Sequence, residues 1–307
     1  MKGFISLLDF STDELTGILD RADELYSDWR SRTMPLSLKG LRVGLWFFGQ
    51  GFRNRVAFEL GAKAMGAIVA YMPGELGVQE PLEDIGPYMD NWFDLLVVRA
   101  KRHEDLLTLV EDAAIPVINA RTDKSHPCEI MGDLQFIRRK RGSLEGLEVA
   151  FVGEVTNLCM SWFEAAARFP IRVTQIAPEG YRADEALVGA MSAGAKGSIA
   201  VSGDMSRIDD SVDLIYADCW PKTGDEAEKA RIKDAFLPYR IEVEHLSRLG
   251  EGALFLPCPP ITRGEELSPE AAEHPLNMNF AAKDFLLHSQ NAIMEAAMDR
   301  SRRGGRA

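Results

Sequence analysis

The stretch Gly49–Arg55, with the sequence GQGFRNR, has residue types suited to binding an anion. It follows an apolar segment, Gly40–Phe48, and leads into Val56–Met65, so this order predicts a buried strand, a turn and a helix. Glycine lets the backbone N–H groups of such a turn approach a ligand, and the positive end of the helix dipole favours negative charge. Arg53 and Arg55 supply two cationic side chains. The stretch predicts an anion site, while the same glycine turn joins many strands to helices without binding a ligand.

Two further side chains of chemical interest follow predicted strands. Arg99 ends the apolar strand Leu95–Arg99, and His126 follows the strand Pro116–Asn119 and precedes a predicted helix. Open α/β sheets bind ligands at the carboxyl ends of their strands. A buried arginine needs a partner there, which a ligand anion or Glu129 would supply. His126 and Glu129 form a conceivable acid–base pair, and the alternative is a structural histidine with its hydrogen bonds satisfied inside the protein.

One predicted helix carries the chain from the first α/β repeat into the second. Its apolar positions Ile130, Leu134 and Ile137 are spaced by four and three residues, as on one face of a helix. The basic run Arg138–Arg141 suits the negative C-terminal end of the helix dipole, and Gly142 can end the helix. This helix therefore connects two α/β units.

Strands and helices alternate along the whole chain, and both halves repeat the alternation. This order predicts the α/β class, with doubly wound parallel sheets covered by helices on both faces. The remaining predicted strands are Ala67–Tyr71, Glu148–Val152, Arg172–Ala177, Ser198–Val201, Leu214–Ala217 and Ala253–Leu256. The remaining predicted helices are one from the N-cap Ser11 to Trp29, then His103–Glu111, Met160–Arg168, Ala183–Ala193, Glu226–Phe236, Ile241–Leu249 and Phe280–Met298.

The composition bounds the class of protein and its partners. The 307 residues suffice for two α/β domains, and the net charge of −12 makes the chain a poor partner for nucleic acid or an anionic membrane. No segment approaches the ~18 apolar residues that span a bilayer, and the N-terminal apolar run is too short for a signal peptide. Four widely spaced cysteines, Cys128, Cys159, Cys219 and Cys258, indicate free thiols rather than a disulfide framework or a metal site. We therefore expect a cytoplasmic protein.

A series of short motifs runs through nearly the full length of the chain. They are LLDFSTDEL, FRNRVAFELGAKAMGA, VVRA, SHPCEIMGDLQFI, VAFVGE, APEGY, VDLIYADCW and ITRGEELSPE, in this order. With them the chain resembles the aspartate/ornithine carbamoyltransferase superfamily, as a divergent member closer to the ornithine-type branch. The resemblance implies a carbamoyl-phosphate domain (residues 1–137 with 284–307) and an amino-acid domain (138–283), joined by two helices. It also implies a homotrimer with sites at subunit interfaces and no metal or organic cofactor.

In this family an amine attacks carbamoyl phosphate and phosphate leaves, so the site needs cationic and N–H donors. The resemblance places Arg53 on the phosphate-loop arginine, and Arg99 and His126 on the catalytic donors to the carbamoyl oxygen. It places Asn157 and Asp218 on groups that hold the amino-acid substrate. The full set of positions that it assigns to substrate binding is Gly51, Phe52, Arg53, Asn54, Arg55, Glu129, Asn157, Asp218, Lys222, Thr223, Cys258 and Pro259.

Several positions depart from the family pattern. The phosphate loop reads GFRNR where the family usually has Ser-Thr-Arg-Thr-Arg, so hydroxyl donors are lost and Phe52 adds a bulky ring. Glu129 replaces a glutamine whose amide helps to hold the carbamoyl group, and a carboxylate there would repel a phosphate-bearing substrate. The other departures are Gln79 for a lysine of a neighbouring subunit, Ala292 for an arginine, Lys222-Thr223-Gly224 for Ser-Met-Gly, and Pro257-Cys258-Pro259-Pro260 for a His-Cys-Leu-Pro sequence.

Three functional hypotheses follow. The first is a transferase with altered specificity, moving a carbamoyl or related acyl group from an anionic donor to the amine of an amino acid or small amine. The second is a non-catalytic paralogue that binds a small ligand or serves as an assembly partner, which Phe52, Glu129 and Ala292 favour. The third is different chemistry in the inherited cleft.

Overall fold

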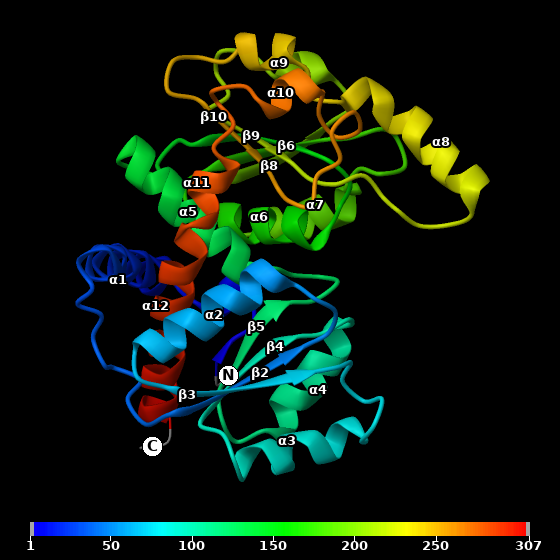
Figure 1. The fold of residues 1–307 in the computed structure, drawn as a ribbon. Helices are drawn as coiled ribbons and strands as arrows, with labels where there is room; N and C mark the ends of the chain where they lie inside the picture. Colours follow the sequence, from blue (N-terminus) through cyan, green and yellow to red (C-terminus); the bar gives the residue numbers. More distant parts are fainter. Residues whose placement is uncertain (1–2, 305–307) are drawn as a thin grey trace. The chain divides into compact units, whose positions relative to one another are not determined.

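The computed structural model describes residues 3–304, with side chains described as far as Arg302. The chain divides into two compact units, Met1–Phe136 with Lys283–Ala307 (unit 1) and Ile137–Ala282 (unit 2). Within the described residues, each unit contains a five-stranded sheet whose strands are all parallel. Helices accompany both sheets (Figure 1). The predicted fold class, two doubly wound parallel α/β domains, is confirmed.

The sheet of unit 1 has the strand order β1-β5-β4-β2-β3. Its strands are β1 (Gly3–Phe4), β2 (Arg42–Phe47), β3 (Ile68–Pro73), β4 (Leu95–Arg99) and β5 (Val117–Arg121), and its helices are α1 (Thr12–Ser31), α2 (Phe52–Ala64), α3 (Leu82–Asp90), α4 (His103–Asp112), most of α5 (Pro127–Arg141), and α12 (Phe285–Gly304). Helix α12 packs against α1 and α2, and α3 packs against α4 (Figure 1). The strand β3 forms one edge of the sheet and is exposed along most of its length.

The sheet of unit 2 has the strand order β10-β9-β6-β7-β8. Its strands are β6 (Glu148–Val152), β7 (Arg172–Ile176), β8 (Ser198–Ser202), β9 (Leu214–Ala217) and β10 (Leu254–Pro257). Its helices are α6 (Asn157–Arg168), α7 (Glu185–Ser192), α8 (Glu226–Phe236), α9 (Val243–Ser247), α10 (Pro269–Ala272) and α11 (Asn279–Lys283) except its last residue. Strands β6 and β9 are almost fully buried. They pair in parallel, so their carboxyl ends lie next to each other.

The start of helix α2 differs from its prediction. The helix begins at Phe52 rather than Val56, so Arg53, Asn54 and Arg55 lie in its first turn and not in a loop. Gly51 is the N-cap, with φ 40° and ψ 38°, and no side chain caps the helix. Hydrophobic periodicity could not show this start, because the first turn is mostly polar and Phe52 is exposed.

Two other element predictions were wrong in extent, and one strand was not predicted. The predicted helix Phe280–Met298 is two helices, α11 and α12, separated at Asp284. Helix α6 begins at Asn157 rather than Met160, after the N-cap Thr156, whose side chain accepts a hydrogen bond from the Cys159 backbone N–H. Strand β1 was missed, because two residues are too short to show a period.

The start of α1 and the end of α5 were predicted more closely. Ser11 and Glu14 form the predicted capping box at the start of α1. Gly142 follows α5 with φ 83°, and its N–H donates a hydrogen bond to the carbonyl of Arg138.

No helix within residues 3–304 is both long enough and apolar enough to cross a membrane.

Candidate active site

The Arg99 side chain lies over the N-terminus of helix α2. A Cβ added at Gly51 would stand 2.9 Å from both Cδ and Nε of Arg99, so only glycine leaves room for this approach. The Nε of Arg99 is buried and has no hydrogen-bond partner. Burial lowers the pKa of Arg99 to about 10, with a further contribution from the neighbouring Arg121, so the guanidinium stays charged at neutral pH. A half-buried cation whose Nε–H is buried without a hydrogen-bond partner, beside a helix N-terminus, is suited to an anionic ligand.

The other side chains of this first helical turn have separate contacts. Asn54 is buried, and its amide donates to the carbonyl of Ala120 over 3.4 Å. Arg55 pairs with Glu59 at 3.3 Å and its guanidinium lies 4.4 Å from the centre of the Tyr71 ring. The contacts with Ala120 of β5 and Tyr71 of β3 hold α2 against the sheet, and a direct role of Asn54 and Arg55 in binding a ligand stays a prediction.

The exposed part of the turn consists of an aromatic ring and an arginine. The ring of Phe52 is 59% exposed, and the guanidinium of Arg53 lies 5.0 Å from its centre. Arg53 is also close enough to Glu129 and Arg99 to influence the pKa of each. Phe52 therefore reaches solvent, while the charge of Arg53 acts on the buried side chains beside the turn.

His126 and Glu129 lie at the start of α5, together with a lysine that the sequence analysis missed. The Nε2 of His126 is 3.7 Å from Oε2 of Glu129, and Nζ of Lys283 is 2.6 Å from Oε1 of the same carboxylate. Lys283 also bonds Asp133 at 2.9 Å. Although burial would raise the pKa of Glu129, the nearby Lys283 and His126 lower it well below its usual range. The buried carboxylate is therefore ionised and has a cationic partner.

The charges around these side chains favour an anion. We call Arg53, Arg99, Arg121 and Lys283, with the carboxylates of Glu129 and Asp133, the cationic cluster. Four cations against two carboxylates leave an excess of two positive charges. Burial, together with Arg99 and Arg121, lowers the pKa of His126 to about 3, so its ring is neutral near pH 7.

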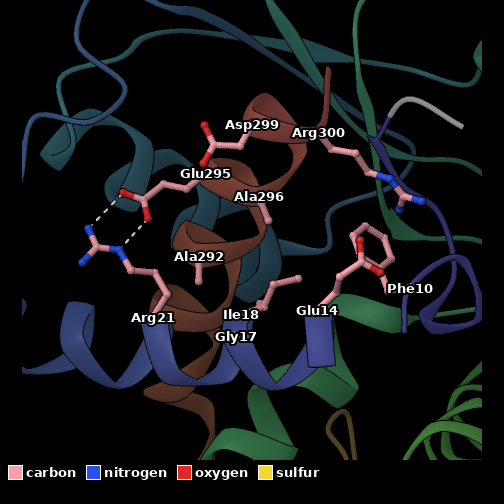
Figure 2. Close-up of a pocket in the computed structure, with 10 residues that line it drawn as sticks. All are labelled: Phe10, Glu14, Gly17, Ile18, Arg21, Ala292, Glu295, Ala296, Asp299 and Arg300. Carbon is pink, nitrogen blue, oxygen red and sulfur yellow. Dashed lines mark hydrogen bonds and ion pairs between the residues drawn. The ribbon is translucent and has the colours of Figure 1, made fainter. Parts of the chain in front are cut away.

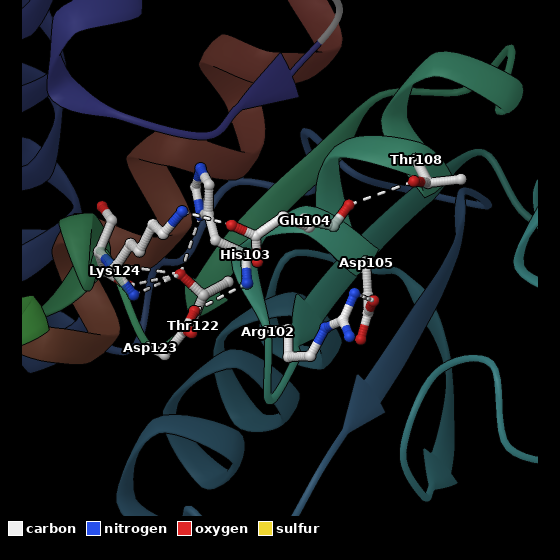
Figure 3. Close-up of polar contacts among 9 residues, drawn as sticks. Arg102, His103, Glu104, Asp105, Thr108, Thr122, Asp123 and Lys124 are labelled. Atoms are coloured by element: carbon white, nitrogen blue, oxygen red, sulfur yellow. Dashed lines mark hydrogen bonds and ion pairs between the residues drawn. The ribbon is translucent and has the colours of Figure 1, made fainter.

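The loop between β5 and α5 is braced by hydrogen bonds, which fix the backbone before His126 (Figure 3). The N–H of Thr122 donates to the carbonyl of Ser125 at 2.8 Å, and the N–H of Ser125 donates to Oγ1 of Thr122 at 3.2 Å. At the start of α4, the N–H of His103 donates to Asp123 at 2.7 Å, and its Nδ1 lies 3.0 Å from Oγ1 of Thr122. The loop is thus tied to a neighbouring helix, which limits the movement of His126.

In unit 2, the strand-end side chain that stands out is Asp218, just after β9. It is buried, accepts a 2.6 Å hydrogen bond from the hydroxyl of Thr156 and accepts another from the N–H of Cys219 at 2.8 Å. Burial raises the pKa of Asp218, while these hydrogen bonds oppose the rise. Asn157, at the first turn of α6, is next to Thr156 in the chain and is also buried. A buried carboxylate fixed in this way can accept hydrogen bonds from an amine.

The remaining candidates of unit 2 fall into two groups. Cys258 is buried at the end of β10, where its N–H donates to the carbonyl of Ala217 at 2.8 Å, and Pro259 beside it is half-buried. Lys222 and Thr223 are exposed, and the Lys222 ammonium bonds the hydroxyl of Thr262 at 3.0 Å. Lys222 lines a groove of about 640 Å³ along α8, and Asp218 does not line this groove. Lys222 therefore belongs to the surface beside α8.

Ala292 lines a separate groove of about 490 Å³ between α1 and α12 (Figure 2). The ion pair between Arg21 and Glu295, at 2.6 Å, forms part of its wall. None of the residues of the cationic cluster lines this groove. The absence of an arginine side chain at Ala292 therefore leaves space beside α1, and not beside His126.

Two charged residues near the predicted site were not identified from the sequence. Arg121 ends β5 just as Arg99 ends β4. Because ligands bind at the carboxyl ends of such strands, Arg121 would have been a candidate if the predicted strand had not stopped at Asn119. Lys283 reaches a partner 150 residues away in the chain. No local pattern marks such a contact.

Comparison with protein families gives two matches that follow each other along the chain. The model described as the carbamoyl-P binding domain of aspartate/ornithine carbamoyltransferase matches residues 2–139. The model described as the Asp/Orn binding domain of the same family matches residues 145–297. Together they account for most of the chain.

Individual relatives agree with these matches. The ornithine carbamoyltransferase of Symbiobacterium thermophilum is 32% identical over 303 residues, covering 97% of this chain and 98% of that protein. The corresponding protein of Ignicoccus hospitalis is 33% identical over 301 residues, covering 95% of this chain and 97% of its own. Among solved structures, ornithine carbamoyltransferase from Pyrococcus furiosus superposes with a TM-score of 0.90 at 26% identity, covering 97% of each chain. That from Gloeobacter violaceus gives 0.85 at 28% identity, covering 97% of this chain and 99% of that one.

Proposed function

The chain belongs to the aspartate/ornithine carbamoyltransferase family, and on that premise we propose that it transfers the carbamoyl group of carbamoyl phosphate to the amine of an ornithine-like amino acid. The observation that carries this proposal is the cationic cluster beside the N-terminus of α2. There Arg99 presents a buried N–H without a partner, and the cluster has an excess of positive charge. A phosphate-bearing donor would supply both the acceptor oxygens and the negative charge.

The reaction would form one bond and break another at the carbamoyl carbon. The amine nitrogen attacks this carbon, the C–O bond to phosphate breaks, and the proton lost by the amine passes to the departing phosphate. Arg53, Arg99 and the first N–H groups of α2 would take up the charge of the departing phosphate. His126, which is neutral near pH 7, would donate a hydrogen bond to the carbamoyl oxygen in the tautomer with its proton on Nε2.

Unit 2 would hold the amino-acid substrate. Asp218 is buried, and hydrogen bonds from Thr156 and Cys219 fix its carboxylate, so it can orient a substrate amine. Asn157 follows β6 and Cys258 follows β10, the two strands that flank β9, and these two buried side chains are the others that we assign to this subsite.

Lys283 answers the main objection to catalysis that the sequence raised. A lone carboxylate at position 129 would repel phosphate, but Lys283 lies 2.6 Å from it and offsets its charge. This favours an active transferase over the non-catalytic alternative. The loss of the hydroxyl donors of the family loop would weaken donor binding without removing the positive charge.

The direct test is to incubate the purified protein with carbamoyl phosphate and separate amines. We expect phosphate release together with a ureido product for ornithine, and less for putrescine, lysine and aspartate. Both products must appear in equal amounts, because phosphate alone also arises from hydrolysis of the donor. Absence of a ureido product with every amine would refute carbamoyl transfer and support the non-catalytic alternative.

We also propose that the protein assembles as a homotrimer. Helix α2 carries the exposed apolar side chains Val56 and Leu60 at a spacing of four, and the edge strand β3 carries exposed Ile68 and Tyr71. An apolar surface over an unpaired strand edge is a common feature of subunit interfaces. We call these four residues the α2–β3 apolar surface.

A further inference from the structure

Gln175, near the carboxyl end of β7, has a fully buried side chain. Its amide nitrogen donates to the carbonyl of Gly153 at 2.9 Å and to the carbonyl of Tyr181 at 3.1 Å, and its amide oxygen accepts from the N–H of Ala183 at 2.8 Å. Because two carbonyls and one N–H face the amide, only this orientation satisfies all three. One glutamine therefore joins the end of β6 to the loop that follows β7.

The first of these bonds fixes the start of the turn between β6 and α6. Gly153 is the first residue after β6, and Asn157 is the first residue of α6. At the end of the turn, the hydroxyl of Thr156 donates to Asp218 at 2.6 Å. A Cβ added at Gly153 would stand 3.3 Å from the Cβ of Asp218, so the backbone of the turn passes close to that side chain. Gln175 thus holds one end of the turn and Asp218 holds the other.

The other two bonds fix the loop that contains Tyr181. The ring of Tyr181 lies 4.8 Å from that of Phe236 in α8, edge to face, and the ring of Phe236 lies 5.9 Å from that of Trp220. Phe236 and Trp220 are buried in a small hydrophobic core against which Tyr181 packs. Trp220 is two residues after Asp218 in the chain. The loop that Gln175 holds therefore packs against the segment that follows Asp218.

We propose that Gln175 is a positioning residue for the amino-acid subsite, which consists of Asn157, Asp218 and Cys258. Its three hydrogen bonds go to backbone groups, so it acts on the substrate only through other residues. It holds the turn that presents Asn157 and the loop that supports the segment after Asp218, so both side chains are in place before the amino acid binds. The inference rests on the proposed function in taking these side chains to bind the amino acid.

Gln175→Met tests this role, because it keeps the length of the side chain and removes all three hydrogen bonds. Two carbonyls and one N–H would then lack a partner, so the turn and the loop should relax away from each other. We expect the KM for ornithine to rise by about 10- to 100-fold, the effect of a small displacement of positioning groups. The KM for carbamoyl phosphate should not change, because the proposed donor site lies in unit 1. General destabilisation would not separate the two KM values in this way.

Asp213→Ala is the matched control in unit 2. It removes the hydrogen bond that Asp213 accepts from the Glu148 N–H at 2.9 Å, at the amino end of β6 and so away from the turn. Both KM values should equal those of the unmodified protein. Hydrogen exchange gives a readout without turnover. Residues 153–157 and 177–183 should exchange at least about tenfold faster in Gln175→Met, and at the unmodified rate in Asp213→Ala.

A milder variant keeps the test open if Gln175→Met does not fold. Burial favours the protonated form of the carboxyl in Gln175→Glu, which can still accept from the Ala183 N–H and donate to one of the two carbonyls. We expect its KM for ornithine to rise by about 3- to 10-fold, the range for one lost hydrogen bond.

An unchanged KM for ornithine in both glutamine variants would overturn the inference, as would equal rises in the KM values of both substrates. Unchanged exchange of the turn and the loop would also overturn it. If the unmodified protein makes no ureido product, carbamoyl transfer is refuted, and the Kd for ornithine from titration calorimetry takes the place of the KM. A Kd that Gln175→Met weakens would then still support the inference, and a Kd that it leaves unchanged, or no binding by the unmodified protein, would refute it.

Discussion

At the scale of single residues, Gly51 meets two separate requirements. Its φ of 40° is in the left-handed region, which disfavours a Cβ, and the Arg99 side chain occupies the place where that Cβ would lie. Gly49 has a φ of 67°, but a Cβ there would have no atom within 4 Å. The two glycines therefore share the backbone requirement and differ in the steric one.

This difference predicts the effect of two alanine substitutions. Gly49→Ala and Gly51→Ala should each lower the free energy of unfolding by about 1–2 kcal/mol, the cost of a left-handed conformation with a Cβ. Only Gly51→Ala should also displace Arg99 and raise the KM for carbamoyl phosphate, by about tenfold or more. Thermal unfolding and steady-state kinetics measure the two effects. Equal KM values for both variants would contradict a role of Arg99 at the helix N-terminus.

His126 gives stability a defined dependence on pH. Its pKa is lowered by burial to about 3, below the ordinary value of 6.5 that applies in the unfolded chain. Between these values the unfolded state binds a proton that the folded state does not, so stability is full above pH 6.5 and falls as the pH falls. The slope should be at most about 1.4 kcal/mol per pH unit. His126→Gln should flatten the urea-unfolding profile between pH 6.5 and 4, and an unchanged slope would refute the assignment.

At the scale of elements, helix N-termini and strand ends place most of the candidate side chains. Arg99 ends β4, His126 precedes α5, and Asp218 follows β9. These places could be predicted from the sequence, because an apolar run shows where a strand ends. The start of helix α2 could not be predicted, because a glycine cap and a mostly polar first turn give no hydrophobic periodicity.

The loop before α5 should matter for catalysis through its hydrogen bonds. Thr122→Val keeps the shape of the side chain but removes the hydroxyl that accepts from the Ser125 N–H and lies next to the His103 ring. We expect unfolding free energy to fall by about 1–3 kcal/mol and kcat to fall more than donor affinity. Thr108→Val, which removes an exposed hydroxyl on α4, is the control. Equal effects of the two substitutions on kcat would contradict the positioning role of the loop.

At the scale of the whole molecule, the α2–β3 apolar surface should govern assembly. Leu60→Glu combined with Ile68→Lys places two charges on side chains that are now 49% and 63% exposed. We expect light scattering after size exclusion to show a trimer for the unmodified protein and a monomer for this variant. Leu237→Glu, at a similarly exposed position in unit 2, should leave the trimer intact. A monomeric unmodified protein would refute the assembly.

The sequence was sufficient for the fold class and for the family, because alternating strands and helices and ordered motifs are spread along the whole chain. It was not sufficient for the electrostatics of the candidate site. Glu129 suggests a repulsive site until Lys283 is placed beside it, and that contact depends on the packing of distant segments. A break between two helices, which periodicity did not reveal, comes directly after this lysine.

The discontinuity of unit 1 also bears on the order in which the chain can fold during synthesis. Helix α12 packs against α1 and α2, and Arg21 of α1 bonds Glu295 of α12 across 274 positions. Unit 2 emerges from the ribosome as one continuous segment before α12 does, so it can complete its core first. Until Lys283 emerges, the carboxylates of Glu129 and Asp133 lack their ammonium partner, which opposes their burial. Unit 1 is thus the unit that a nascent chain finishes last.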